Sequence, residues 1–153
     1  MKKFALFITT LLFSVTVFAQ KVSITDFCYD SGDVISTFNK EDVVRRLKGT
    51  GFTVIKAKIE NLIGPGGALY PVKTYILYRH STNTKVEMLE YPESVTFNST
   101  SEATAFIQEA LNIGYIRRGH EAGYYSLSRY DEYCGIEGVF QRGRVILFDY
   151  SIP

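Results

Sequence analysis

The sequence has few of the residues on which most metal sites and many catalytic sites depend. Its 153 residues include two cysteines, two histidines and no tryptophan. The chain has no Cys-x-x-Cys spacing and no histidines four residues apart, so the usual zinc-site patterns are missing. A site built from His120, Glu121 and Asp131 gains no support from such spacing. We therefore expect no metal and no cofactor.

An excess of charge of either sign is also missing. The chain has 17 basic and 16 acidic residues, and 15 and 16 once residues 1–19 are set aside. Proteins that bind nucleic acids neutralise phosphates with a surplus of lysine and arginine. We therefore expect no nucleic-acid partner.

Long apolar runs are absent except at the start of the chain. Lys2 and Lys3 precede an apolar stretch over 4–18, and small residues stand three positions and one position before Gln20. This pattern predicts a secretory signal peptide at 1–19, cleaved before Gln20. The alternative is an uncleaved anchor, but the run is shorter than the roughly 20 residues that a bilayer requires. We expect an exported protein, periplasmic or extracellular, with no membrane contact after cleavage.

The remaining residues, 20–153, have the length of one domain with one hydrophobic core. A lone cysteine pair in an exported domain is usually oxidised, so we expect a disulfide between Cys28 and Cys134. This bond would close a loop of about 100 residues, which the chain-entropy model values at roughly 4–5 kcal/mol. The alternative is two buried, unpaired thiols.

The strongest local pattern predicts a helix over 99–115. Ser99 and Glu102 fit a capping box, in which each side chain accepts a hydrogen bond from the backbone N–H of the other residue. Gly114 stands where a helix often ends. The apolar stripe expected to face the core is Ala103, Phe106, Ile107, Ala110 and Leu111.

A second helix is predicted to begin at Asn39 and to end at Gly49 or Gly51. Its charged residues are expected to form a solvated face. The residues expected to face inward are Val43, Val44 and Leu47.

The clearest strand is predicted over 52–62, where apolar and charged residues alternate. We expect one buried face (Ile55, Ala57 and Ile59) and one solvated face (Lys56, Lys58 and Glu60).

A glycine-rich segment, 63–68, follows this strand, and we expect a loop that is free to take part in binding. Further strands are predicted over 22–29, 72–79, 85–91, 115–118, 124–130, 136–141 and 144–152.

The order of these elements predicts an α+β fold of two layers, with one antiparallel β-sheet and two helices on one face. A weak internal repeat accompanies it, because each helix is followed by a loop and a hairpin. The two hairpins end in similar six-residue segments, 86–91 and 145–150. We therefore expect a strand followed by two α-β-β-β units, either a degenerate duplication or a chance likeness.

One catalytic constellation can be assembled from the available residue types. Cys134 could act as a nucleophile, His120 as its base and Asp131 as the group that orients the base. The expected disulfide competes for Cys134, and such residue combinations arise easily by chance. We therefore expect that the protein is not an enzyme, and a cysteine-dependent hydrolase is the weakest of three functional hypotheses.

The last third of the chain is rich in tyrosine and arginine, which are enriched at interface hot spots. Because neighbouring strand residues face opposite ways, one of Tyr124 and Tyr125 should be buried and the other exposed. An arginine is costly to bury, so we expect Tyr125 to be exposed together with Arg129. The residues expected to bind a partner are Tyr125, Arg129, Tyr133 and Arg117, and we call them the tyrosine–arginine cluster.

The leading functional hypothesis is an exported domain that binds another protein, of which inhibitors and immunity proteins are examples. The second hypothesis is a small-ligand or glycan-binding domain that uses the same tyrosines beside the 63–68 loop. The sequence does not name the partner.

Overall fold

The computed structural model of the chain describes residues 21–28, 39–112, 116–118, 123–127 and 135–150. The predicted signal peptide therefore lies outside the described residues. Among the residues described, no helix is both long enough and apolar enough to cross a lipid bilayer.

Two α-helices and one antiparallel β-sheet make up the described part of the chain. The helical elements are η1 (Ile24–Phe27), α1 (Lys40–Gly49), α2 (Thr100–Asn112) and the short 3₁₀ turns η2 (Pro65–Gly67) and η3 (His80–Thr82). The strands are β1 (Thr53–Ile63), β2 (Leu69–Arg79), β3 (Thr84–Met88), β4 (Pro92–Thr96), β5 (Ile116–Arg118), β6 (Tyr124–Leu127), β7 (Ile136–Arg142) and β8 (Val145–Tyr150).

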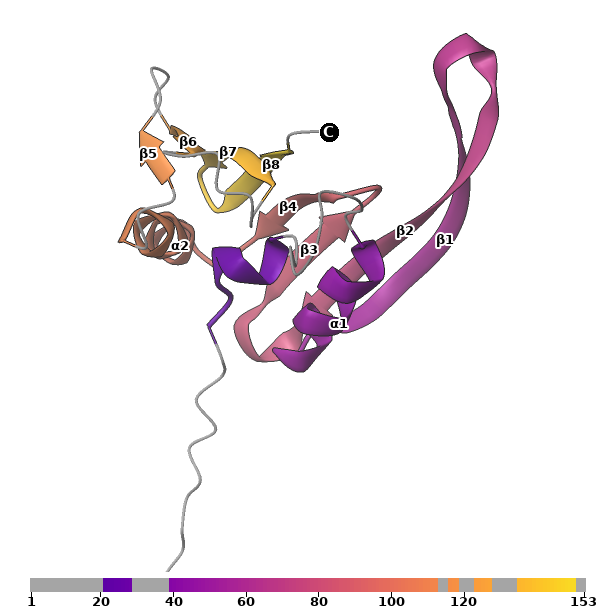
Figure 1. The fold of residues 1–153 in the computed structure, drawn as a ribbon. Coiled ribbons are helices and arrows are strands. Elements are labelled where there is room, and N and C mark those ends of the chain that lie inside the picture. The colour runs from indigo at the N-terminus through magenta and orange to yellow at the C-terminus, as the bar shows by residue number, and fades with distance from the viewer. Residues whose placement is uncertain (1–20, 29–38, 113–115, 119–122, 128–134, 151–153) are drawn as a thin grey trace, which may run out of the picture.

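The predicted two-layer α+β class is confirmed. The described sheet has eight strands in the order β1-β2-β3-β4-β8-β7-β6-β5, and every neighbouring pair is antiparallel. Both helices and η1 contribute side chains to the same buried cluster, so they cover one face of the sheet (Figure 1).

The internal repeat is present in the topology, with four strands in each unit. The second unit has the four strands predicted over 115–152, and the first unit has one strand more than predicted. Each unit is a helix followed by a four-stranded meander, α1-β1-β2-β3-β4 and α2-β5-β6-β7-β8, and the units join where β4 pairs with β8. The extra strand, β4, follows a turn in which the Leu89 N–H donates to the Tyr91 carbonyl. The segment 86–91 therefore begins in the third strand of the first unit and continues into the turn after it, whereas 145–150 is the fourth strand of the second unit.

The strand predicted over 22–29 is wrong, because Ile24–Phe27 forms the 3₁₀ helix η1. The Ser23 side chain caps this helix, and Asp26 accepts a hydrogen bond from the Ser23 N–H at 2.9 Å. This local capping satisfies backbone groups that a strand would have to pair elsewhere. The turn buries Ile24 and Phe27 between the two helices and the sheet.

The predicted helices are confirmed, with small shifts in their bounds. The Glu102 N–H donates to the Ser99 hydroxyl at 3.2 Å, and the Ser99 N–H donates to the Glu102 carboxylate at 3.3 Å. Asn39 caps α1 by accepting from the Glu41 N–H. The predicted inward stripes are buried at Val43, Val44, Leu47, Ala103, Phe106, Ile107 and Ala110, whereas Leu111 is half-buried.

Aromatic rings connect the two units at the centre of the core. The Phe106 ring lies 6.2 Å from Phe27, 5.4 Å from Phe97 and 6.3 Å from Phe148, measured between centroids. These rings come from α2, η1, the segment after β4, and β8. The core is therefore shared by both units.

Candidate binding surface on the β1–β2 hairpin

The outer part of the β1–β2 hairpin, residues 56–74, projects from the body of the protein (Figure 1). We call this segment the arm. Val54 of β1 and Tyr75 of β2, just below the arm, belong to or pack against the core cluster. No residue of the arm does so. The sheet therefore extends beyond the layer of helices that covers the rest of it.

This extension overturns the burial predicted for the 52–62 strand. Ile55 is 57% exposed, Ile59 is 71% exposed, and Ala57 is exposed as well. A bulge between Val54 and Lys56 changes the register at the point where the strand leaves the core. The sequence predicts correctly which residues of 56–60 share a face, but α1 does not reach far enough to cover that face.

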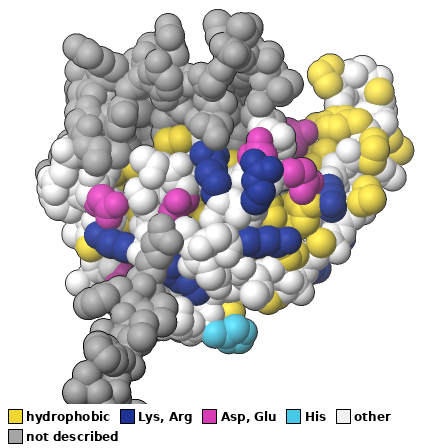
Figure 2. Space-filling view, turned by 60° about the horizontal axis from the view of Figure 1, so that its bottom comes forward, with side chains coloured by type: hydrophobic (Ala, Val, Ile, Leu, Met, Phe, Trp, Pro, Cys, Tyr) yellow, Lys and Arg dark blue, Asp and Glu magenta, His cyan; other side chains and the backbone are white. Residues whose placement is uncertain are grey.

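The helix-side face of the arm is mostly apolar. Ala57 is paired with the core residue Tyr75, so alternate residues along both strands share this side. Ile63 is 75% exposed and is paired with Leu69, which is 65% exposed. Figure 2 shows hydrophobic side chains gathered on the projecting arm. The apolar face of the arm consists of Ala57, Ile59, Ile63, Leu69 and Pro71.

The predicted 63–68 loop forms the tip of the arm. The Gly64 N–H donates to the Ala68 carbonyl at 2.7 Å, and the Gly67 N–H donates to the Gly64 carbonyl at 3.1 Å. Gly66 and Gly67 have φ values of 77° and 79°, which other residues adopt only with strain. The tip is thus a closed turn that places Ile63 and Leu69 opposite each other.

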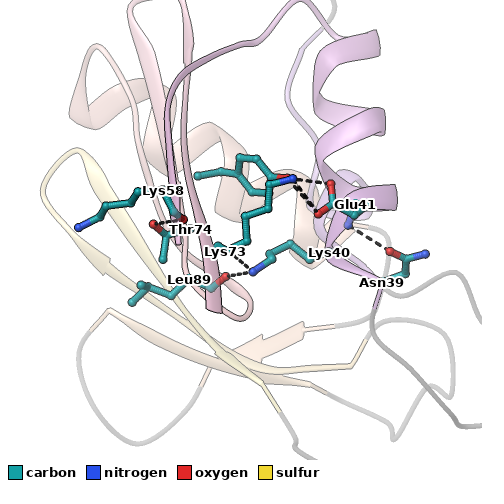
Figure 3. A network of polar contacts seen from close by, with 8 residues as sticks. Asn39, Lys40, Glu41, Lys58, Lys73, Thr74 and Leu89 are labelled. Atoms are coloured by element: carbon teal, nitrogen blue, oxygen red, sulfur yellow. Dashed lines mark hydrogen bonds and ion pairs between the residues drawn. The ribbon is translucent and has the colours of Figure 1, made fainter. Parts of the chain in front are cut away.

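Polar contacts at the base of the arm attach it to α1 (Figure 3). The Tyr75 hydroxyl donates to the Glu41 carboxylate, 2.9 Å from each oxygen, and the Lys73 ammonium lies 3.8 Å from that carboxylate. The Lys40 ammonium donates to the Lys73 carbonyl and, at 2.6 Å, to the Leu89 carbonyl. These contacts tie the first turn of α1 to β2 and to the β3–β4 turn, so they fix the direction in which the arm leaves the body.

The charges at this base influence one another. Burial lowers the pKa of the Lys40 ammonium, Glu41 and Glu90 oppose that shift, and Lys73 adds to it. The pKa of Lys73 is raised, first by its hydrogen bond with Tyr75 and then by the charge of Glu41. A mixed cluster of this kind holds a helix end in place.

The tyrosine–arginine cluster lies only partly within the described residues. Arg129 and Tyr133 lie outside the described residues, and Arg117 is described only as a backbone position in β5. The same holds for Cys134, His120 and Asp131, the residues of the hydrolase hypothesis. Among the residues that are described, no group of three or more metal-ligating side chains comes together.

The faces predicted for Tyr124 and Tyr125 are reversed. Tyr125 is paired with Val139, which is fully buried, and its half-buried side chain packs against the core. Tyr124 is paired with Phe140 and therefore lies on the opposite face. The alternation of residues along β6 shows that Tyr124 and Tyr125 lie on opposite faces of the sheet, but it does not show which face the helices cover.

Tyr124 borders a shallow, open hollow of about 290 Å³ on the face away from the helices. Its ring lies over Gly138, where a Cβ atom would come within 2.4 Å of the Tyr124 hydroxyl. The guanidinium carbon of Arg142 lies over the ring of Phe140, 5.2 Å from the ring centroid. The residues that line the hollow are Tyr124, Phe140, Arg142, Leu147, Phe148 and Asp149.

The 63–68 loop and the tyrosines of β6 do not come together. Four strands, β3, β4, β8 and β7, lie between β2 and β6 in the sheet. The tyrosines of β6 therefore do not form a combined site with the loop, and the hollow at Tyr124 is a separate feature.

The chain matches no family of known proteins, no curated protein and no solved structure. A functional proposal therefore depends on the geometry of this chain alone.

Proposed function

We propose that the protein is an exported domain that acts by binding another protein, and that the apolar face of the arm is its contact surface. The observation that supports this proposal is the exposure of Ile59, Ile63 and Leu69 on one side of a projecting hairpin. Soluble proteins seldom leave several large aliphatic side chains exposed together, and such patches usually mark contact sites.

The surroundings of this face fit a protein interface better than a ligand pocket. Lys73 shares the face at the base of the arm, and Lys58 and Glu60 lie on the other side of the hairpin. An apolar patch bordered by a charged residue, as Lys73 borders this face, is common in protein–protein contacts. A projecting hairpin is convex, whereas small-molecule sites are concave.

The experiment is capture of partners from the native cell envelope with the purified protein and two variants. We expect the unsubstituted protein to retain a partner that the Ile63→Ser/Leu69→Ser protein loses, because both apolar anchors at the tip are removed. Tyr124→Ala is the matched control on the opposite face, and it should still capture that partner.

The outcome that would contradict the proposal is capture by the arm variant at the level of the unsubstituted protein. Loss of capture with Tyr124→Ala alone would move the contact surface to the hollow. Thermal melts of both variants must accompany the experiment, because a variant that fails to fold reports nothing about the contact.

A small ligand or a glycan in the hollow at Tyr124 is the second candidate function. Two aromatic rings, Tyr124 and Phe140, and the cation of Arg142 favour a planar or sugar-like ligand. The hollow is at the lower limit of the volumes usual for ligand sites and is open to solvent. Titration with glycans, followed by the fluorescence of the tyrosines, would test it.

Export is part of the proposal and has a direct test. The basic and apolar segments at 1–19 support cleavage by the secretory pathway. Mass measurement of the protein purified from its native cells should give a chain that begins at Gln20. A chain that retains residues 1–19 would contradict export by cleavage.

We also propose the Cys28–Cys134 disulfide for the exported protein. The Tyr150 hydroxyl donates to the Phe27 carbonyl at 3.3 Å, beside Cys28, and Tyr150 is paired with Ile136, two residues after Cys134. The chain is thus held close on both sides of the expected bond. Denatured, oxidised protein should show no free thiol, and Cys28→Ala should lower the melting temperature. Two titratable thiols would contradict the bond.

A further inference from the structure

The outer edge of β1 pairs with no other strand among the residues that the structure describes. In the described sheet β1 stands at the end of the strand order and pairs only with β2. An edge strand presents main-chain N–H and C=O groups that can pair with another strand. β1 has 11 residues, whereas β5 at the other end of the sheet has three. Beyond its bulge at Val54 and Lys56, β1 continues without a further irregularity to Ile63.

We propose that two copies of the protein associate through this edge, with their β1 strands antiparallel and Ile59 of one copy opposite Ile59 of the other. The arrangement has two-fold symmetry, as most protein dimers do, and each copy offers the same edge. It extends one sheet across both molecules and keeps the helices of both copies on the same side.

The charges along β1 support this register. With Ile59 at the centre, Lys58 of each copy lies opposite Glu60 of the other, so two pairs of opposite charge form. Opposite charges directly across an antiparallel pair stabilise it, and like charges destabilise it. The neighbours of these residues in β2 are Thr74 and Val72, which are uncharged.

Neighbouring registers that also keep the helices of both copies on the same side of the sheet are less favourable. A centre at Lys58 places two lysines opposite each other, and a centre at Glu60 does the same with two glutamates. A centre at Ala57 places Lys56 opposite Lys58 twice. Of these four registers, only the one centred on Ile59 makes attractive pairs without a repulsive one.

The proposed dimer concerns the edge of the arm and leaves its apolar face open. Because Ile59 belongs to that face, the two faces would lie side by side in the dimer and form one larger surface. Dimerisation through the edge of β1 does not require the other protein that the arm binds, and binding of that protein does not require the dimer.

The test is a charge-reversal experiment read by sedimentation. The purified protein should sediment at twice the mass of one chain. Lys58→Glu places carboxylates opposite each other in the dimer, and Glu60→Lys places ammonium groups opposite each other, so each variant alone should be mainly monomeric. A mixture of the two variants restores both attractive pairs and should recover the dimer.

The mixture is informative because only contacts between chains can recover in it. In each variant, positions 58 and 60 of one chain carry charges of the same sign, so the ion pair that Lys58 and Glu60 form in the native chain is lost. Mixing the two variants does not restore this pair within either chain. Lys85→Glu is the matched control, since Lys85 pairs with Glu87 in the same way on the interior strand β3. This control should remain dimeric.

Cross-linking gives a second readout. Ile59→Cys places two thiols opposite each other in the proposed register, so mild oxidation should give a covalent dimer on a non-reducing gel. Lys85→Cys should give none. A monomeric native protein, dimeric single variants, or a mixture that stays monomeric would each overturn the proposal, as would the absence of the Ile59→Cys product.

The two proposals fail separately. The Ile63→Ser/Leu69→Ser protein keeps Lys58, Ile59 and Glu60, so it should remain dimeric while it loses the partner. A dimeric protein that captures nothing would contradict the proposed function alone, and a monomer that captures its partner through the arm would contradict the edge alone.

Discussion

The two α-β-β-β-β units have the same topology but differ in their first hairpin. In the first unit β1 and β2 have 11 residues each, whereas the described strands β5 and β6 of the second unit have three and four. Both units contribute a helix to the same core and meet at the β4–β8 pair. The fold therefore does not require a long first hairpin, which suggests that the length of the arm serves another purpose.

The burial of side chains supports the same conclusion. On β2, Leu77 is fully buried, but eight residues earlier Leu69 is 65% exposed. Val72 within the arm is buried, yet it does not belong to the core cluster. The core ends at Tyr75 on this strand, and the last polar contacts with α1 are made two residues further out, at Lys73. One strand thus has a part that stabilises the body and a part that contributes little to it.

The largest expected effect comes from the core that both units share. Phe106→Ala should lower the free energy of unfolding by about 3–5 kcal/mol, because it removes a ring packed against three other aromatic rings. Gln108→Ala on the exposed side of α2 should change it by less than about 0.5 kcal/mol. Denaturant unfolding measures both, and equal small effects would show that the stripe is not buried.

A smaller effect is expected at the close contact in the second unit. Gly138→Ala should cost about 1–3 kcal/mol, because the new methyl group meets the ring of Tyr124. In a Tyr124→Ala background the same substitution should cost much less, since the ring is gone. If the cost is unchanged in that background, the contact is not its cause.

The smallest effect on stability is expected at the base of the arm. Tyr75→Phe removes the hydroxyl that donates to Glu41 and should cost about 1 kcal/mol. Tyr78→Phe is the matched control, because its hydroxyl bonds to Asn83 at the exposed end of the hairpin loop. Thermal melts should show a larger decrease for Tyr75→Phe, and the reverse order would contradict the anchoring of the arm by α1.

Local patterns in the sequence predicted the local structure well. The capping box of Ser99 and Glu102 and the stripe through Phe106 are confirmed, because both depend only on residues within one helix. The strand predicted over 22–29 failed for the same kind of reason. Its alternation is weaker than the capping of a 3₁₀ turn by Ser23 and Asp26, which is also a pattern of residues close together in the sequence.

Relations between layers could not be predicted from the sequence. Alternation identified the shared face of Ala57 and Ile59, but the reach of α1 decides whether that face is covered. For the same reason, the faces predicted for Tyr124 and Tyr125 are the reverse of those in the structure. The candidate surface was missed because exposed aliphatic residues in a strand have the same pattern as buried ones. The glycine-rich segment after Ile63 indicates a loop that can take part in binding, but it does not indicate that the strands on either side of it project from the body.

The most direct test of the account is a chain in which the arm is shortened. Residues 61–71 are replaced by Asn-Gly, so that a two-residue turn joins Glu60 to Val72, which are already paired. We predict a cooperative thermal melt close to that of the full protein, together with loss of the partner captured from the cell envelope. A shortened chain that does not fold, or one that folds and still captures the partner, would contradict the claim that the arm is a binding element attached to a self-sufficient body.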